Sequence, residues 1–331
     1  MLIDDVNGVR KKRGHIVCLT AGLLAGAVSV HAQSYPSRSV RFIVPMAPGG
    51  SGDHTSRLMS QKLQALWRQN VVVDNRAGGT GTIALETAAN ARPDGYTISL
   101  CTGSHAARQA MQARLSFDLM RSFTPLTQVI SQPYVLTVHP SVQARTVAEL
   151  VSRANETPRG LTYGSAGLGS LQHLSGALFS IQGKAKLLHV PYKGGGPAMT
   201  DLIGGQIDMI FMTSPEAAPH VQSGKVRSLA VSSVRRLKSL PRLPTMVEAG
   251  ITGYEMTQWY GVVAPTGLPP AVLARLSSGL IEVIKSPDLV ERFAKDDVEV
   301  VGSTPDEFRA HIAAEIKRFE RAVKAAGLKL D

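Results

Sequence analysis

The amino-acid sequence predicts an α/β protein with parallel sheets and helices on both faces of each sheet. Two observations lead to this fold class: short runs of β-branched and apolar residues alternate with stretches of helical spacing, and no tandem repeat interrupts the alternation. The 331 residues are enough for two domains or one large one. The two cysteines, Cys18 and Cys101, cannot supply a disulfide framework or a four-ligand zinc site, so side-chain packing must hold the fold together.

The predicted elements follow one another along most of the chain. Runs typical of strands cover residues 40–44, 71–73, 96–100, 134–138, 207–211 and 228–231. Helical signals cover residues 53–67, 80–91, 146–155, 170–182, 197–204, 270–284 and 305–325. No low-complexity linker separates two halves. Two domains would therefore share short crossovers, for which residues 134–138 and 259–264 are the candidates.

A targeting segment precedes this alternation. A basic cluster, Lys11 to Arg13, is followed by the uncharged apolar run 16–30, and compact residues stand at Val30 and Ala32, the two positions that a signal peptidase reads. The sequence therefore predicts a signal peptide over residues 1–32. The apolar run is shorter than the roughly 20 residues that span a bilayer, so we expect an exported, soluble mature chain.

The charge balance raises the question of a polyanionic partner. The chain has 36 Lys and Arg against 25 Asp and Glu, a net charge of +11. Loss of residues 1–32 removes four basic and two acidic residues, which leaves 32 against 23, or +9. The remaining basic residues are scattered and form no stripe with aromatics, and an exported protein does not meet chromosomal DNA. We therefore expect no nucleic-acid partner.

The first candidate binding loop is the glycine-rich turn over residues 45–53. It follows the predicted strand 40–44 and leads into a helix expected from His54. Glycines let the backbone approach a ligand closely, Asp53 can cap the helix, and the free N–H groups of a first helical turn attract an anion. An ordinary strand-to-helix turn is the alternative interpretation.

The second candidate loop covers residues 163–170. The hydroxyls of Ser165 and Ser170 and several backbone donors converge where a helix begins, and no Lys or Arg occurs between Tyr163 and His173. Such a loop suits a carboxylate or a similar small anion that is held by dipoles instead of by an ion pair. Of the weaker clusters, residues 76–81 and 193–197 are expected to be turns in preference to sites. Ser104 follows a strand, where open sheets place ligand-contacting loops, and a site and a turn both remain open for it.

The chain shows no motif that calls for catalysis. Tyr163 stands where a nucleophile elbow around Ser165 would need glycine, no H-E-x-x-H or C-x-x-C occurs, and the histidines are not at ligand spacing on one helix face. We therefore expect no catalytic residue, metal or cofactor. His173 is expected to be a packing or capping residue and Cys101 a small buried one.

Segments in a fixed order along the mature chain carry a family resemblance. They are residues 45–50 with Asp53 and Arg57, 76–81, 92–97, 163–174, 189–194, 204–208, 224–227 and 244–250. Together they resemble the Bug (Bordetella uptake gene) family of periplasmic solute-binding receptors, which serve tripartite tricarboxylate transporters. The chain departs from the family at Met46, where Phe is common, and in the segment 212–216, which lacks the Asp-Asn pair often found there.

The resemblance implies a two-lobed periplasmic binding protein of type II-like architecture, with a parallel-rich sheet in each lobe and two crossover strands. Lobe 1 is expected to hold residues 34–137 and 260–331, and lobe 2 residues 138–259. Family members hold a ligand carboxylate between two strand-to-helix loops, partly through ordered water. By motif position these loops are residues 45–53 and 163–173 here.

Loops and resemblance together give the expected ligand-binding residues: Met46, Ala47, Gly49, Gly50, Ser51, Asp53, Ser104, Tyr163, Ser165, Gly167, Leu168, Gly169, Ser170, His173 and Asp208. Met46, Ser104, Thr213 and Trp259 are candidates for ligand specificity. The expected function is that of a monomeric, non-enzymatic receptor in the periplasm, which delivers a small organic acid to the permease of a tripartite tricarboxylate transporter. Two alternatives are a ligand-sensing partner of a membrane regulator and a periplasmic serine hydrolase that uses Ser165 or Ser170 with His173.

Overall fold

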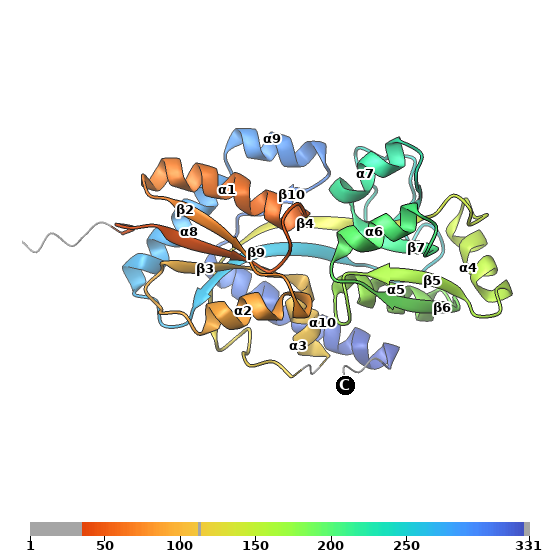
Figure 1. The fold of residues 1–331 in the computed structure, drawn as a ribbon, viewed down its shortest axis with the longest axis horizontal. Coiled ribbons are helices and arrows are strands. Elements are labelled where there is room, and N and C mark those ends of the chain that lie inside the picture. Colours follow the sequence, from red (N-terminus) through yellow and green to blue (C-terminus); the bar gives the residue numbers. More distant parts are fainter. Residues whose placement is uncertain (1–34, 112–113, 328–331) are drawn as a thin grey trace, which may run out of the picture. The chain divides into compact units, whose positions relative to one another are not determined.

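The computed structural model describes residues 35–111 and 114–327, which form an α/β unit with a mixed sheet between helices (Figure 1). The predicted signal peptide lies outside these residues. The strands are β1 (Val40–Val44), β2 (Val71–Asn75), β3 (Thr97–Thr102), β4 (Phe123–Val138), β5 (Leu161–Ser165), β6 (Leu187–Pro191), β7 (Met209–Thr213), β8 (Arg227–Val231), β9 (Thr257–Pro265) and β10 (Glu299–Val300). The helices are α1 (Ser51–Trp67), the short 3₁₀ helix η1 (Gly79–Gly81), α2 (Thr82–Ala89), α3 (Gly103–Ala110), α4 (Val147–Glu156), α5 (Leu171–Gln182), α6 (Gly195–Ile203), α7 (Ser214–Gln222), α8 (Pro270–Ile284), α9 (Pro287–Lys295) and α10 (Pro305–Ala326).

The strands group into two lobes that share the long strand β4. The first lobe contains β1, β2, β3, β9 and β10 with the first part of β4, and the second contains β5 to β8 with the last part of β4. Pairs β1–β2, β1–β3, β5–β6 and β5–β7 are parallel, whereas every pair that involves β4 or β9 is antiparallel. Each lobe therefore contains the expected parallel strand-helix-strand units, and the two crossover strands run against their neighbours.

Alternation along β1 explains why helices cover both faces of the first lobe. Val40, Phe42 and Val44 are fully buried with apolar residues of α1 and α8, whereas Ile43 belongs to the cluster formed with α2, α3 and α10. Figure 1 shows α1 and α2 on opposite sides of these strands. Successive side chains of a strand point to opposite faces, so a run that is apolar at both parities must be covered twice.

The second lobe repeats this construction around the end of β4. Val135 packs with α6 and α7, whereas Leu136 on the other face belongs to the cluster that includes α4 and α5. The loops that follow the strands of both lobes and lead into helices lie at a common edge. This is the edge at which open α/β sheets bind ligands.

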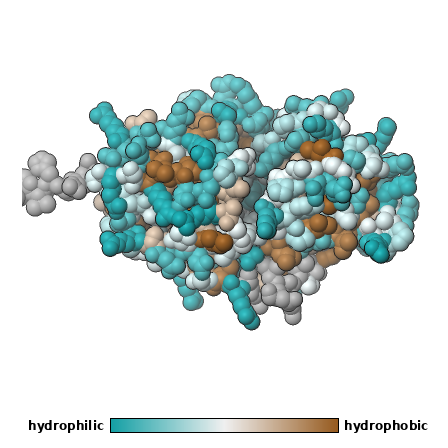
Figure 2. All heavy atoms as spheres, in the orientation of Figure 1, coloured by the Kyte–Doolittle hydropathy of each residue, from teal (hydrophilic) through white to brown (hydrophobic). Residues whose placement is uncertain are grey.

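The face drawn in Figure 2 is largely hydrophilic with small, separate hydrophobic spots. Among residues 35–111 and 114–327, no helix has the length and apolar character needed to cross a membrane.

The predicted strands and helices are confirmed, with shifted ends. The strand expected at 207–211 is β7, two residues later, and the crossover candidates are confirmed as parts of β4 and β9. Strands β5, β6 and β10 and helices α3, α7 and α9 were not predicted. Strand β6 is only partly buried, and His189 and Pro191 interrupt its apolar residues.

Candidate functional site

A cavity of about 1080 Å³ lies where the loops of both lobes meet. Its wall includes the N-cap residues of six helices. These are Gly50 of α1, Gly81 of α2, Thr102 of α3, Ser170 of α5, Gly194 of α6 and Thr213 of α7. Each helix N-terminus carries a partial positive charge and unsatisfied N–H groups, so the cavity is favourable for an anion.

The charged residues of the wall are few. Among the residues that the structure describes, the lining contains one lysine, Lys193, no arginine and one carboxylate, Glu216. His105 also lines the cavity, and burial lowers its pKa to about 4, so this imidazole is neutral near pH 7. The positive potential at the cavity therefore comes mainly from backbone dipoles.

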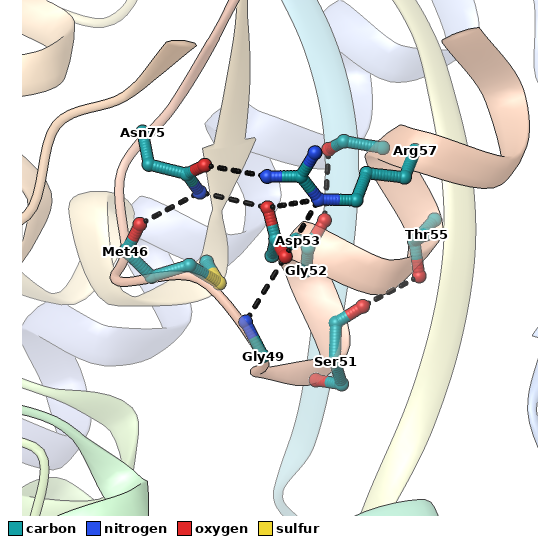
Figure 3. A network of polar contacts seen from close by, with 9 residues as sticks. Met46, Gly49, Ser51, Gly52, Asp53, Thr55, Arg57 and Asn75 are labelled. Carbon is teal, nitrogen blue, oxygen red and sulfur yellow. Dashed lines mark hydrogen bonds and ion pairs between the residues drawn. The ribbon is translucent and has the colours of Figure 1, made fainter. Parts of the chain in front are cut away.

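A buried carboxylate fixes the shape of the loop before α1 (Figure 3). Asp53 is 3% exposed, and its oxygens accept from Gly49 N (3.0 Å), Arg57 Nε (3.0 Å) and Asn75 Nδ2 (2.8 Å). Asn75 Nδ2 also donates to the carbonyl of Met46 at 3.1 Å. Burial would raise the pKa of Asp53, but the hydrogen bonds from Arg57, Gly49 and Asn75 hold it below its ordinary value. The ionised carboxylate thus holds both ends of the loop.

The sequence suggested that Asp53 caps helix α1, but the position of the helix shows a different role. Helix α1 begins at Ser51, so Gly50 is its N-cap and Asp53 lies inside the first turn. From there Asp53 accepts the N–H of Gly49, which precedes the N-cap, in the manner of an acidic residue at the third position of a helix. Asp53 does not line the cavity, whereas Met46, Ala47, Gly49 and Gly50 do.

The loop before α5 is held from behind by two histidines. Ser165 is fully buried, and its Oγ lies 2.6 Å from His189 Nε2 and 3.1 Å from the N–H of Gly167. His173 Nδ1 accepts from Gly169 N at 3.2 Å, and its ring stacks on His189 with centroids 4.1 Å apart. The packing and capping role expected for His173 is confirmed. The hydrolase alternative has no support in this geometry, because the serine that contacts a histidine is fully buried.

Ser170 and Gly167 are the expected residues of this loop that reach the cavity wall. The hydroxyl of Ser170 accepts from His173 N at 3.1 Å and so caps α5. A hydroxyl that accepts this bond still carries a proton to donate. Ala166 also lines the cavity, and its N–H donates to Gln172 Oε1 at 2.7 Å.

Other expected residues lie away from the cavity wall. Tyr163 is 4% exposed in the core of the second lobe, beside the ring of His189. Both the N–H and the hydroxyl of Thr162 donate to Asp208 at 2.7 Å, so Asp208 braces β5. Of the specificity candidates, Trp259 is buried in the core and its Nε1 donates to Glu315 at 3.1 Å. Met46, Ser104 and Thr213 do line the cavity.

Hydrogen bonds join the two lobes at two places beside the cavity. Leu171 N, the first of α5, donates to Ser104 Oγ at 3.1 Å. The carbonyl of Leu168 accepts from Thr80 Oγ1 at 3.1 Å and from Arg108 at 3.0 Å, although the Leu168 side chain is 53% exposed. These bonds hold the β5–α5 loop against α3 and η1 of the first lobe.

The second place where the lobes are joined involves Glu216, which was not among the predicted site residues. Ser51 N, at the start of α1, donates to Glu216 Oε1 at 3.2 Å, and Thr213 Oγ1 donates to Glu216 Oε2 at 2.6 Å. The signal was present in the sequence, since Pro215 and Glu216 open a helix directly after a buried strand. Residues 45–53 were predicted as a binding loop for the same reason, because they also join a strand to a helix.

The structure gives no reason to add a metal or a reactive thiol to this site. Within the described ranges, no cluster of His, Cys, Asp and Glu could hold a metal ion. Cys101 is fully buried, as expected, and burial raises the pKa of its thiol to about 12. It is therefore a packing residue of β3.

Two lobes that share crossover strands and surround a cavity with loops and helix N-termini define a periplasmic solute-binding protein, which is a non-enzymatic class. Residues 55–328 match the family model described as "Tripartite tricarboxylate transporter family receptor". The chain belongs to this family, and the resemblance to Bug proteins is confirmed.

Individual relatives agree with this assignment over most of their length. Protein BugT of Bordetella pertussis is 34% identical over 317 residues, which cover 95% of this chain and 96% of BugT. The solved structure "R. palustris Rpa4515 with adipate" has a TM-score of 0.86 at 34% identity and covers 89% of this chain and 99% of its own. The periplasmic binding protein BugD has a TM-score of 0.84 at 31% identity, with 89% and 99% covered.

Proposed function

We propose that this protein captures a small carboxylate in the cavity between its lobes and delivers it to the permease of a tripartite tricarboxylate transporter. The observation that carries the proposal is the convergence of six helix N-termini on one cavity whose wall holds a single lysine among the described residues. Backbone N–H groups and helix dipoles hold an anion without a fixed arginine fork. A relative of similar fold was solved with adipate, which has a carboxylate at each end.

The residues proposed to contact the ligand are expected binding residues that line the cavity. We propose that Ala47, Gly49 and Gly50 of the first loop and Gly167 and Ser170 of the second contact the ligand directly or through water. Three other expected residues lie outside the wall and would position these loops: Asp53 through Gly49, and Ser165 and His173 through the turn at residues 167–169.

Closure of the lobes on the ligand is the second part of the proposal. The lobes would comprise residues 34–137 with 260–331 and residues 138–259, and would move about β4 and β9, the strands that join them. A ligand that contacts both lobes binds the closed form better and shifts the population toward it. The closed monomer would then dock on the permease, with residues 1–32 removed as a signal peptide on export to the periplasm.

Titration calorimetry with a panel of mono-, di- and tricarboxylates tests the proposal. We expect at least one carboxylate to bind at a ratio of one per chain, and a variant Ser170→Ala to bind it more weakly. Binding of no carboxylate by a folded protein would contradict the receptor function. Binding without any stimulation of uptake by vesicles that contain the cognate permease would contradict the delivery step alone.

A further inference from the structure

Glu216 is the one carboxylate among the described residues that line the cavity, and this position is unusual for a site built to attract anions. It lies in the first turn of α7, directly after β7, and reaches across the cavity to the first turn of α1. Its two oxygens accept from Ser51 N and from the Thr213 hydroxyl. In residues 35–111 and 114–327, Glu216 forms no ion pair.

The consequence for a ligand is that two of the six helix N-termini are already occupied by a negative charge. A carboxylate beside the N-termini of α1 and α7 is stabilised by their dipoles in the same way as a ligand carboxylate would be. A second negative group placed there would be repelled. The N-termini of α2, α3, α5 and α6 remain available to the carboxylate of a ligand.

The surroundings of Glu216 offer more acceptors. Gln132 of β4 and Gln258 of β9 are register partners, 1% and 8% exposed, and in the described part of the chain the Oε1 atom of each is buried without a hydrogen-bond partner. Gln132 Nε2 donates to the hydroxyl of Ser51 at 3.4 Å, and Ser51 Oγ lies 2.6 Å from Tyr260 OH. Gln258 and Tyr260 both line the cavity.

Ser51 connects the two glutamine-bearing strands with Glu216, because its N–H binds the carboxylate and its hydroxyl binds Gln132 and Tyr260. A buried acceptor without a hydrogen-bond partner is less favourable than a satisfied one. A ligand group that donates hydrogen bonds would remove that cost, whereas a carboxylate would not.

We propose that Glu216 makes this receptor selective for carboxylates whose opposite end donates hydrogen bonds, above all an ammonium group, and selects against a second carboxylate at that end. The inference rests on the proposed function, since it assumes that one carboxylate binds in the same cavity. It deepens that function by naming the ligand class: a small amino- or hydroxy-carboxylate in place of a di- or tricarboxylate.

Calorimetric titration with two matched series tests the assignment. The six-carbon series is adipate, 6-hydroxyhexanoate and 6-aminohexanoate, and the four-carbon series is succinate, 4-hydroxybutyrate and 4-aminobutyrate. Within a series only the second end changes. We expect the wild type to bind the amino member of the better-fitting series most tightly and the dicarboxylate least tightly. In Glu216→Gln the ratio of these two dissociation constants should shift by about tenfold toward the dicarboxylate, because a charge-assisted bond and a charge repulsion are both lost.

Control variants distinguish the effect of the charge at Glu216 from a change in net charge and from a loss of folding. Glu282→Gln removes the same charge from an exposed position on α8 and should leave the ratio unchanged. Glu216→Asp retains the charge and should keep the wild-type order even at lower affinity. Thermal unfolding of each variant checks that it is folded.

The outcomes distinguish this inference from the proposed function. If carboxylates bind but the ratio is the same in wild type and Glu216→Gln, or if the wild type prefers the dicarboxylate, the selectivity inference is overturned and the receptor function stands. If no member of either series binds, the inference is overturned, and the receptor function is overturned with it only when the wider carboxylate panel also fails.

Discussion

The imidazole rings of His173 and His189 stack behind the β5–α5 loop, with centroids 4.1 Å apart and planes 23° from parallel. Each ring holds the loop through one nitrogen: His173 through the N–H of Gly169 and His189 through the hydroxyl of Ser165. Burial lowers the pKa of both to about 4, and the neighbouring His173 adds to the shift of His189. The loop is therefore built on two neutral histidines.

The histidine pair predicts that the protein loses stability in moderate acid. A histidine whose folded pKa is about 4 and whose unfolded pKa is about 6.5 binds fewer protons in the folded state between these pH values. Its stabilising effect is therefore complete above pH 6.5 and is lost as pH falls toward 4, by up to about 1.4 kcal/mol per pH unit for each such group. Urea unfolding at pH 7.5, 6.5, 5.5 and 4.5 measures this slope.

A substitution identifies the contribution of His173. Asparagine can present an oxygen near the position of Nδ1, so His173→Asn should retain the acceptor for Gly169 N while it removes the titrating group. We expect a shallower fall in the free energy of unfolding between pH 6.5 and 4.5 than in the wild type. Equal slopes in the wild type and in His173→Asn would contradict the assignment.

Asp53 should contribute more to the free energy of unfolding than an exposed aspartate in a similar ion pair does. Asp53→Asn places an amide where Gly49 N, Arg57 and Asn75 all donate, and we expect a loss of about 2 to 3 kcal/mol because buried donors lose their acceptor. The matched variant Asp288→Asn breaks an ion pair with Lys62 whose aspartate is 64% exposed, and should lower the free energy of unfolding by much less than Asp53→Asn does. Chemical denaturation measures both, and equal losses would show that the buried network does not stabilise the loop.

Much of this fold could be predicted because its burial leaves a clear pattern. Strand β1 is apolar at both parities, and Thr304 with Glu307 forms a complete capping box at the start of α10, so both elements are readable without a structure. The last three residues of β5, Tyr163, Gly164 and Ser165, belong to a predicted turn because glycine and serine are typical of turns. The structure gives the reason for this sequence: a Cβ on Gly164 would lie 2.5 Å from Ile207 Cδ1. A tertiary contact, not a turn, requires that glycine.

The candidate site was predictable as two loops but not as a set of contacts. Sequence order shows that residues 45–53 and 163–170 each join a strand to a helix, and the carboxyl ends of parallel strands share one edge. It does not show that the Ser165 hydroxyl turns inward to His189, 24 positions away, or that Glu216 meets Ser51 over a separation of 165 residues. Which side chains line a cavity depends on such long-range contacts, and no local spacing encodes them.

Gly261 on the crossover strand β9 should not tolerate a side chain. A Cβ at this position would lie 2.0 Å from Phe308 Cζ, and Phe308 is a fully buried ring of α10. We expect Gly261→Ala to lower the free energy of unfolding by about 1 to 3 kcal/mol or to prevent folding, because a close-packed core cannot absorb an added methyl group at that distance. The control is Gly196→Ala in α6, where no atom lies within 4 Å of the added Cβ; it should be neutral or slightly stabilising.

Ser104 should affect ligand affinity more than it affects stability, because its bond to Leu171 N joins the two lobes. When the lobes separate, water can satisfy this N–H, so Ser104→Ala destabilises mainly the closed form. We expect the affinity for a bound carboxylate to fall about five- to tenfold while the free energy of unfolding without ligand changes by less than about 1 kcal/mol. Calorimetry and chemical denaturation on the same preparations measure the two quantities, with Ser278→Ala on the exposed face of α8 as the control. A loss of stability with unchanged affinity would show that the bond stabilises the fold as a whole and does not contribute to closure.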